Sequence, residues 1–187
     1  MYNIKPYANE DTLVAQLSEV LALTFGINPD NAKLISGAVA LHDIGKVWIP
    51  KYILCKPEKL LPCEFEIMKN HTLWGASILS GLHGGFGTVA RNICMLHHEN
   101  WDGTGYWGLK GGEFPYYCQI ASICDVYVAL TVQRAYKEPW LSKDALEYIK
   151  NQAGKQFCPI LVDVFLSLFT ERGFECRYSS LNLAIPA

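Results

Sequence analysis

Apolar positions along this chain follow a helical period. Leu13, Val14, Leu17, Val20 and Leu21 form one stripe with spacings of three and four residues, which predicts a helix over residues 10–25. The same period, broken at prolines and glycines, predicts further helices over residues 28–41, 62–71, 74–82, 88–96, 115–131 and 142–154, and from residue 159 onward. No convincing strand pattern occurs, so the predicted fold class is all-α.

Histidine and aspartate residues stand where these helices end or face inward. Four helical segments contribute the candidate metal ligands, which are His42, Asp43, His71, His97, His98 and Asp125. Taken alone, His71 fits a hydrogen-bonded core residue better than a ligand. Burying the adjacent rings of His97 and His98, however, requires several polar partners, and a metal supplies one for each ring. The set has nitrogen and oxygen donors and no thiolate, which suits two octahedral cations such as iron, manganese or nickel.

The segment from Leu41 to Lys46 is the centre of this pattern. Asp43 can bridge two cations through its two oxygens, while His42 offers a ring nitrogen to one of them. Lys46 follows His42 by four residues, so both point the same way if the helix continues. The alternative is an ordinary helix C-terminus, in which Gly45 ends the helix and Lys46 offsets the helix dipole.

A site with two cations predicts a reaction. Two metals about 4 Å apart hold a hydroxide and polarise a phosphoryl oxygen, so we expect hydrolysis of a phosphate ester. The segment 101–108 is rich in glycine and aromatic residues, which indicates either a contact surface or packing within a loop. Arg134 and Lys137 either hold a phosphate or complement a helix dipole.

Length and composition narrow the class of protein. The chain has 187 residues, half of them hydrophobic, which is enough for one domain with a sizeable core. No apolar run reaches roughly 18 residues, the length that spans a bilayer, and the N-terminus lacks the pattern of a signal peptide. A net charge of −2 gives no electrostatic basis for nucleic-acid binding. Seven cysteines without a CxxC pair favour free thiols in a reducing cytoplasm.

Several longer segments surround the candidate ligands. They read His42-Asp43-Ile44-Gly45-Lys46, Met68-Lys69-Asn70-His71, His97-His98-Glu99, Trp101-Asp102-Gly103-Thr104-Gly105-Tyr106, Asp125-Val126-Tyr127 and Ala129-Leu130-Thr131. Together they resemble the HD-GYP subgroup of the HD-domain phosphohydrolases. The resemblance covers residues 10–169 and is specific. It predicts a single HD-GYP-like domain over residues 1–187, with residues 174–187 as a C-terminal tail.

The resemblance implies an all-helical bundle with a bi- or trinuclear metal centre in its core, and hydrolysis of cyclic di-GMP to pGpG or GMP. By position it assigns His42, Asp43 and Asp125 to the first metal, and Asp43, His71, His97 and His98 to the second. Lys46 would stabilise charge on the reacting phosphate, and Arg134 and Lys137 would hold the phosphate and guanine side of the substrate. Residues 101–107, the signature loop, are linked in this family to substrate access and to GGDEF-type partners.

Three positions depart from the family pattern. Glu10 stands where the first helix usually carries a histidine, so we expect it to ligate the first metal or to bond a water on that metal. Trp107 replaces the proline of the signature loop, which is expected to free the backbone there. Val128 replaces an aspartate and removes a charge near Arg134.

The leading hypothesis is a cytoplasmic, metal-dependent cyclic di-GMP phosphodiesterase with two divalent transition metals. It is expected either to stand alone or to be a fragment of a larger sensor protein. The alternative, favoured by Glu10 and Val128, is a weakened receptor that binds metal or cyclic nucleotide and signals through the signature loop without hydrolysis. A third hypothesis is a phosphohydrolase for another nucleotide, against which the signature loop argues.

Overall fold

The structure, a computed structural model, describes residues 7–133 and 138–170, and helices form its framework. The elements in chain order are α1 (Tyr7–Thr24), α2 (Pro29–Val39), the 3-10 helix η1 (Ile44–Trp48), α3 (Lys51–Leu54), α4 (Pro62–Ile78), η2 (Leu79–Gly81), α5 (Gly84–Leu96), α6 (Tyr116–Thr131), α7 (Ser142–Asn151) and α8 (Pro159–Ser167). The described residues include no strand, only an isolated bridge between Ala153 and Phe157. The predicted all-α class is confirmed.

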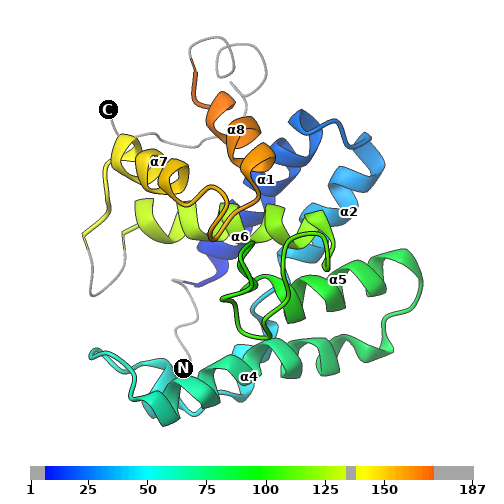
Figure 1. Cartoon of the computed structure of the whole chain (residues 1–187). Helices are drawn as coiled ribbons and strands as arrows, with labels where there is room; N and C mark the ends of the chain where they lie inside the picture. The colour runs from blue at the N-terminus through cyan, green and yellow to red at the C-terminus, as the bar shows by residue number, and fades with distance from the viewer. Residues whose placement is uncertain (1–6, 134–137, 171–187) are drawn as a thin grey trace.

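Helix α6 lies at the centre of the molecule. It crosses the middle of Figure 1, with α7 and α8 on one side and α4 and α5 on the other. All its residues from Cys118 to Cys124 are buried. Helix α1 packs against both α2 and α6, and α6 also contacts α5, α7 and α8. A helix surrounded in this way is apolar on most of its faces, so a polar residue within it needs a specific partner.

Prolines and a polar cap set the starts of three helices. The side chain of Asn28 accepts a hydrogen bond from the Asn31 amide at 2.9 Å, and Pro29 follows as the first residue of α2. Pro62 and Pro159 open α4 and α8 in the same way. Proline suits this position because the first helical amides have no partner within the helix. These starts agree with the sequence prediction.

Other boundaries differ from the prediction. The helices expected over residues 62–71 and 74–82 are one continuous helix, α4, which ends at Ile78 and is followed by η2. Gly75 does not break this helix. A Cβ there would lie 3.2 Å from Cys94 Sγ and 3.3 Å from the Gly45 amide, so the glycine allows close packing instead. Helix α5 begins at Gly84, four residues before the expected start, and α7 ends at Asn151 and not at Gly154.

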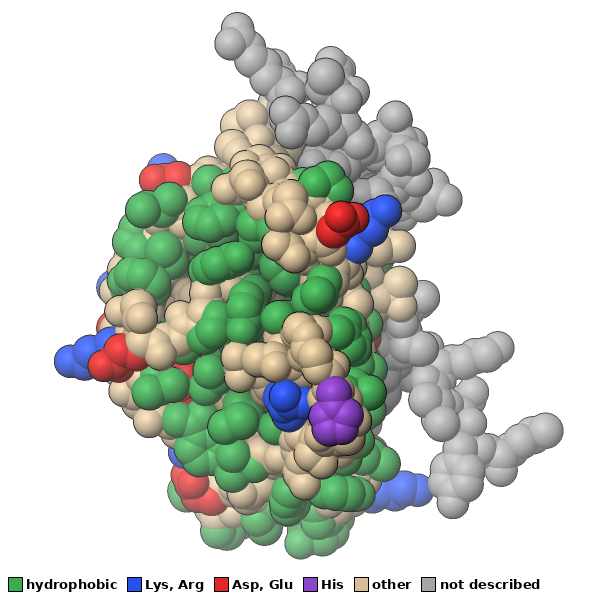
Figure 2. Space-filling view, turned by 90° about the vertical axis from the view of Figure 1, so that its right-hand side faces the viewer, with side chains coloured by type: hydrophobic (Ala, Val, Ile, Leu, Met, Phe, Trp, Pro, Cys, Tyr) green, Lys and Arg blue, Asp and Glu red, His purple; other side chains and the backbone are tan. Residues whose placement is uncertain are grey.

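The surface retains much apolar area. Figure 2 shows one face on which hydrophobic side chains gather with few charged side chains among them. Such area is usual in a domain of this size, because polar atoms alone cannot cover its surface. Within the described residues, no helix combines the length and the hydropathy that crossing a membrane requires.

Candidate metal centre

His42 and Asp43 lie in a turn and not in a helix. Helix α2 ends at Val39, and η1 begins at Ile44. The ring Nδ1 of His42 lies 2.8 Å from the carbonyl oxygen of Val39, and the ring is buried. A carbonyl accepts from a protonated Nδ1, so Nε2 is the ring nitrogen directed into the interior. Burial acts to lower the pKa of His42, but the charge of Asp43 outweighs it and raises the pKa to about 9, so Nε2 ligates a metal only after it gives up its proton.

Gly45 brings this turn against α4. It lies within η1 and does not adopt a positive φ, so it does not end a helix as the alternative interpretation held. A Cβ at Gly45 would overlap the carbonyl oxygen of His71 and approach the amide of Gly75 to 2.5 Å. Only a residue without a side chain permits this approach, which places Asp43 beside His71.

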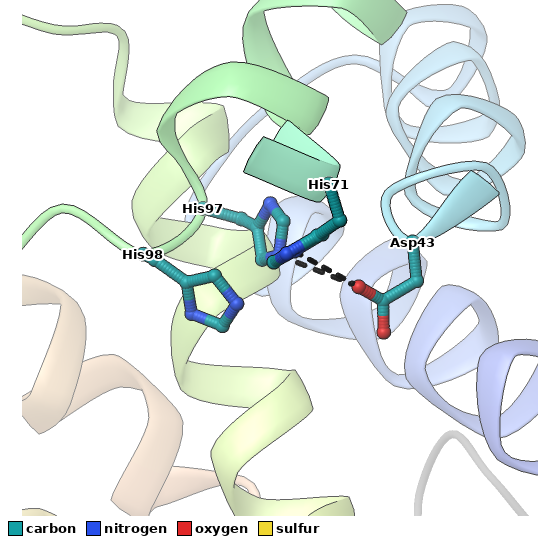
Figure 3. A group of neighbouring side chains, drawn as sticks. All are labelled: Asp43, His71, His97 and His98. Atoms are coloured by element: carbon teal, nitrogen blue, oxygen red, sulfur yellow. Dashed lines mark hydrogen bonds and ion pairs between the residues drawn. The ribbon is translucent and has the colours of Figure 1, made fainter. Parts of the chain in front are cut away.

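Four side chains from three separate parts of the chain converge on one point (Figure 3). The ligand atoms of Asp43, His71, His97 and His98 all lie within 4.8 Å of one another. Asp43 Oδ1 is 3.3 Å from His71 Nε2 and 3.8 Å from His97 Nε2. His71 comes from α4, His97 is the C-cap of α5, and His98 follows it. The structure thus brings together the four residues expected for the second metal.

Backbone carbonyls orient two of these rings. His71 Nδ1 lies 2.7 Å from the Met68 oxygen, and His97 Nδ1 lies 2.9 Å from the Ile93 oxygen. Burial lowers the pKa of His97 well below its usual value and that of His98 to about 3. Both of those rings are therefore neutral near pH 7, which is the form that ligates a metal.

A second group shares Asp43 with the first. Ligand atoms of Asp11, His42 and Asp43 lie within 4.8 Å of one another. His42 Nε2 is 3.3 Å from Asp43 Oδ2 and 3.9 Å from Asp125 Oδ1. The two oxygens of Asp43 therefore face different groups of ligands, as a bridging carboxylate requires.

The α1 carboxylate in this group is Asp11, whereas the sequence interpretation chose Glu10. Successive helical residues are rotated by about 100° around the axis, so the two side chains face different directions. Burial raises the pKa of Asp11 although the charge of His42 opposes this, and the charges of Asp43 and Asp125 raise it further. The hydrophobic stripe of α1 carried a signal for Asp11, which precedes Val14 by three residues as Glu10 precedes it by four.

The donors that face the centre fit a cation. His42 Nε2 and Asp43 Oδ1 are buried, and neither makes a hydrogen bond with any described residue. Each has an ionisable neighbour at 3.3 Å, and a bound divalent cation would give each atom a direct partner. Imidazole nitrogens with carboxylate oxygens are donors that iron, manganese and nickel accept.

Lys46 lies at the edge of the centre. Its ammonium bonds Asp43 Oδ2, and a third of its side chain is exposed. Burial acts to lower the pKa of Lys46, but the charge of Asp43 outweighs it and raises the pKa. Lys46 therefore stays charged. It bonds the carboxylate of Asp43, a candidate metal ligand, across one turn, and the α-helix that would have aligned it with His42 does not continue.

The combination of a His-Asp turn with three more histidines identifies the family. A family model described as HD domain matches residues 3–161. The chain belongs to the HD-domain family. HD-domain phosphohydrolases are metal-dependent, which agrees with the donors described above.

Known relatives of this HD domain include cyclic dinucleotide phosphodiesterases. A probable cyclic di-GMP phosphodiesterase of Vibrio cholerae serotype O1 is 46% identical over 136 residues, covering 69% of this chain and 31% of that protein. The 3'3'-cGAMP-specific phosphodiesterase 2 of the same organism is 40% identical over 159 residues, covering 84% and 30%. The HD domain chain thus spans less than a third of the length of these two relatives.

The fold also has a solved counterpart. Bd1817 of Bdellovibrio bacteriovorus, described as an HDG"Y"P protein, aligns with a TM-score of 0.68 at 20% identity. The alignment covers 88% of this chain and 53% of that one. At this identity the likeness concerns the fold alone, and it agrees with the helical arrangement described above.

Glu99 fastens the signature loop of the HD domain. Its buried carboxylate accepts hydrogen bonds from the amides of Trp107 at 2.7 Å and Leu109 at 2.8 Å. A proline at position 107 has no amide hydrogen and could not make the first of these bonds. The expectation that Trp107 frees the backbone is therefore wrong, because the tryptophan adds a tie to Glu99.

The two tryptophans of the signature loop differ in role: one packs within the loop, and the other stays exposed as a candidate contact surface. Trp101 is partly buried against Gly111, where any Cβ would overlap its ring. Trp107 keeps 41% of its surface exposed, although its indole donates to the Met95 carbonyl at 3.0 Å. Trp101 is thus loop packing, and Trp107 is the aromatic side chain of the pair that remains open to contact.

A pocket of about 360 Å³ adjoins the centre. Its lining includes His98 and Asp125 from the candidate metal ligands, Tyr106 from the signature loop, and Gln156 from the turn before α8. A cavity of this size beside a cation site is of the kind that holds a small ligand.

The remaining candidates fall elsewhere. Arg134 and Lys137 lie outside the described residues. Val128 is buried in α6, with 4% of its surface exposed. His83 is exposed at the start of α5.

Proposed function

We propose that this HD domain is a metal-dependent phosphodiesterase for cyclic dinucleotides, with cyclic di-GMP as the leading substrate. The observation that carries the proposal is the position of Asp43, whose two oxygens face separate groups of ligands. Two centres that share a carboxylate suit phosphodiester hydrolysis. The relatives named for cyclic di-GMP and 3'3'-cGAMP support this class of substrate.

Two divalent transition metals, iron or manganese with nickel as a further option, fit the donors. In this proposal the first is held by Asp11, His42, Asp43 and Asp125, and the second by Asp43, His71, His97 and His98. When bound, such cations activate water and polarise a phosphoryl oxygen. The alternative is that Glu10 ligates the first metal in place of Asp11, and alanine variants of the two residues distinguish the two assignments.

The protein's own groups position the substrate. The ammonium of Lys46 lies next to Asp43 and would neutralise charge on a phosphate held at the centre. Arg134 and Lys137 would bind the phosphate and guanine side of the substrate, as the family resemblance implies. The buried thiols of Cys94, Cys118 and Cys124 are free, which fits a reducing cytoplasm.

The test is to purify the chain without air, measure its metals by elemental analysis, and assay cyclic di-GMP hydrolysis by chromatography of pGpG and GMP. We expect close to two metals per chain and turnover that a chelator abolishes. A chain that takes up no transition metal, or a metal-loaded chain that leaves cyclic di-GMP intact, contradicts the proposal.

A second candidate is a receptor that binds the nucleotide without hydrolysis. The exposed ring of Trp107 on the signature loop favours it, because this ring offers a contact for a GGDEF-type protein. Val128 supports it as well, since the family has a charge at that position. Saturable cyclic di-GMP binding by metal-loaded protein, with no product formed, distinguishes this candidate from the enzyme.

A further inference from the structure

The pocket beside the metal centre carries two amide side chains, which differ in what holds them. Asn100 donates its amino group to Thr104 Oγ1 at 3.0 Å, and Thr104 in turn donates to Asp102 Oδ1 at 2.6 Å. One hydrogen of the Asn100 amino group is therefore used in this bond to the signature loop.

Gln156 is held in the opposite sense. The hydroxyl of Tyr148 donates to its Oε1 at 3.2 Å. Because the oxygen and the amino group are the two arms of one planar amide, this bond turns Nε2, a donor, away from Tyr148. Gln156 lines the pocket, so its donor arm is the one available to a ligand there.

The backbone of Gln156 is fixed as well. Its carbonyl oxygen accepts from the Trp101 amide at 3.1 Å, and the Lys155 carbonyl accepts from the Asp102 amide at 2.9 Å. The turn between α7 and α8 is thus fastened to the signature loop. A donor that is held at both its backbone and its side chain discriminates between ligands better than a mobile one.

We infer that Gln156 is a specificity-determining residue that donates a hydrogen bond to O6 of a guanine base in this pocket. The inference rests on the proposed function. His98 and Asp125 line the same pocket, so a dinucleotide whose phosphate lies at the metal centre places an adjoining base there. Guanine presents the acceptor O6 where adenine presents its amino group, so a fixed donor favours guanine.

The experiment compares binding and kcat/KM for cyclic di-GMP, 3'3'-cGAMP and cyclic di-AMP on metal-loaded protein. Gln156→Met removes the donor at similar size, and Gln156→Glu replaces it with an acceptor. Tyr148→Phe releases the amide so that it can rotate. Gln152→Glu is the matched control, since it makes the same change in the same turn at a residue that does not line the pocket.

We expect the wild type to prefer cyclic di-GMP over cyclic di-AMP by on the order of tenfold, the effect of one unpaired hydrogen-bonding group. This ratio should fall toward one in Gln156→Met, reverse in Gln156→Glu, shrink in Tyr148→Phe and stay unchanged in Gln152→Glu. Circular dichroism and metal content show that each variant is folded and loaded. If Gln156 only supported the turn, its variants would change binding and kcat/KM for all three dinucleotides by the same factor.

The outcomes separate the two proposals. If the wild type turns over cyclic dinucleotides but the Gln156 variants keep its guanine-to-adenine ratio, the inference is overturned while the proposed function stands. An equal change of ratio in Gln152→Glu also overturns it. If the wild type binds none of the three dinucleotides, the proposed function and the inference fall together.

Discussion

Gly45 contacts the backbone of His71 so closely that no side chain fits between them. The approach joins η1 to α4 and sets Asp43 Oδ1 at 3.3 Å from His71 Nε2. We therefore predict that Gly45→Ala destabilises the fold by about 1–3 kcal/mol or more, because the new Cβ forces backbone to move. Urea unfolding measures the change. Gly85→Ala, at a helical position with open space around the Cβ, is the control and should not lower stability, since alanine favours a helix over glycine.

His97 and His98 are predicted to hold metal. The double variant His97→Ala/His98→Ala removes two of the four donors in the group that contains Asp43, so transition metal bound at the second position should be lost in elemental analysis. His83→Ala removes an exposed imidazole outside the group and should retain the full metal content. Equal stoichiometry in the double variant and the wild type would show that the ligands are misassigned.

Lys46 is predicted to act on the phosphate. Lys46→Ala should lower hydrolysis of cyclic di-GMP, or affinity for it, by a factor on the order of 10 to 1,000, as expected for loss of one charge stabiliser. Metal content should stay the same, because the ammonium is not a ligand. Lys110→Ala removes an exposed lysine that follows the signature loop, and this variant should behave as the wild type. A Lys46 variant with full activity and affinity would exclude the role.

Asp11 and Glu10 make opposite predictions for the first metal. If Asp11 is the α1 ligand, Asp11→Ala should lower the metal count and Glu10→Ala should not, because Asp11 lies with His42 and Asp43. Glu10→His, which restores the residue usual in the family, should then leave hydrolysis unchanged. The reverse result, with metal lost in Glu10→Ala and faster hydrolysis in Glu10→His, would return the role to Glu10.

Glu99 is predicted to hold the signature loop in place. The Glu99 carboxylate accepts hydrogen bonds from two backbone amides. In Glu99→Gln the side-chain amino group faces one of these donors, so that bond is lost at a cost of about 1–3 kcal/mol. Hydrogen exchange at Trp107 and Leu109 should accelerate, and KM for cyclic di-GMP should rise. Glu113→Gln alters an exposed glutamate whose side chain accepts from the Lys110 amide, outside the contacts of Glu99, and should change neither quantity. Unchanged exchange at both amides would contradict the predicted tie.

The sequence by itself determined the all-helical class and pointed to most of the candidate ligands. A period of three and four residues is a local property, so Leu13, Val14 and Leu17 mark α1 without knowledge of what they pack against. Asp43, His71, His97 and His98 stand out because a buried imidazole or carboxylate is costly without a partner, and this holds whatever the arrangement of the helices.

The tertiary structure decided what depends on direction and distance. Glu10 and Asp11 both extend the stripe of α1, and only the packing of α1 beside α6 and the His42 turn brings Asp11 together with His42 and Asp43. Gly45 reads as a helix end in the sequence, but its lack of a Cβ matters because α4 lies against it. The bond from Trp107 to Glu99 joins residues whose pairing no local pattern specifies. These three features depend on chain segments that the common core brings together, and a local periodicity contains no information about such contacts.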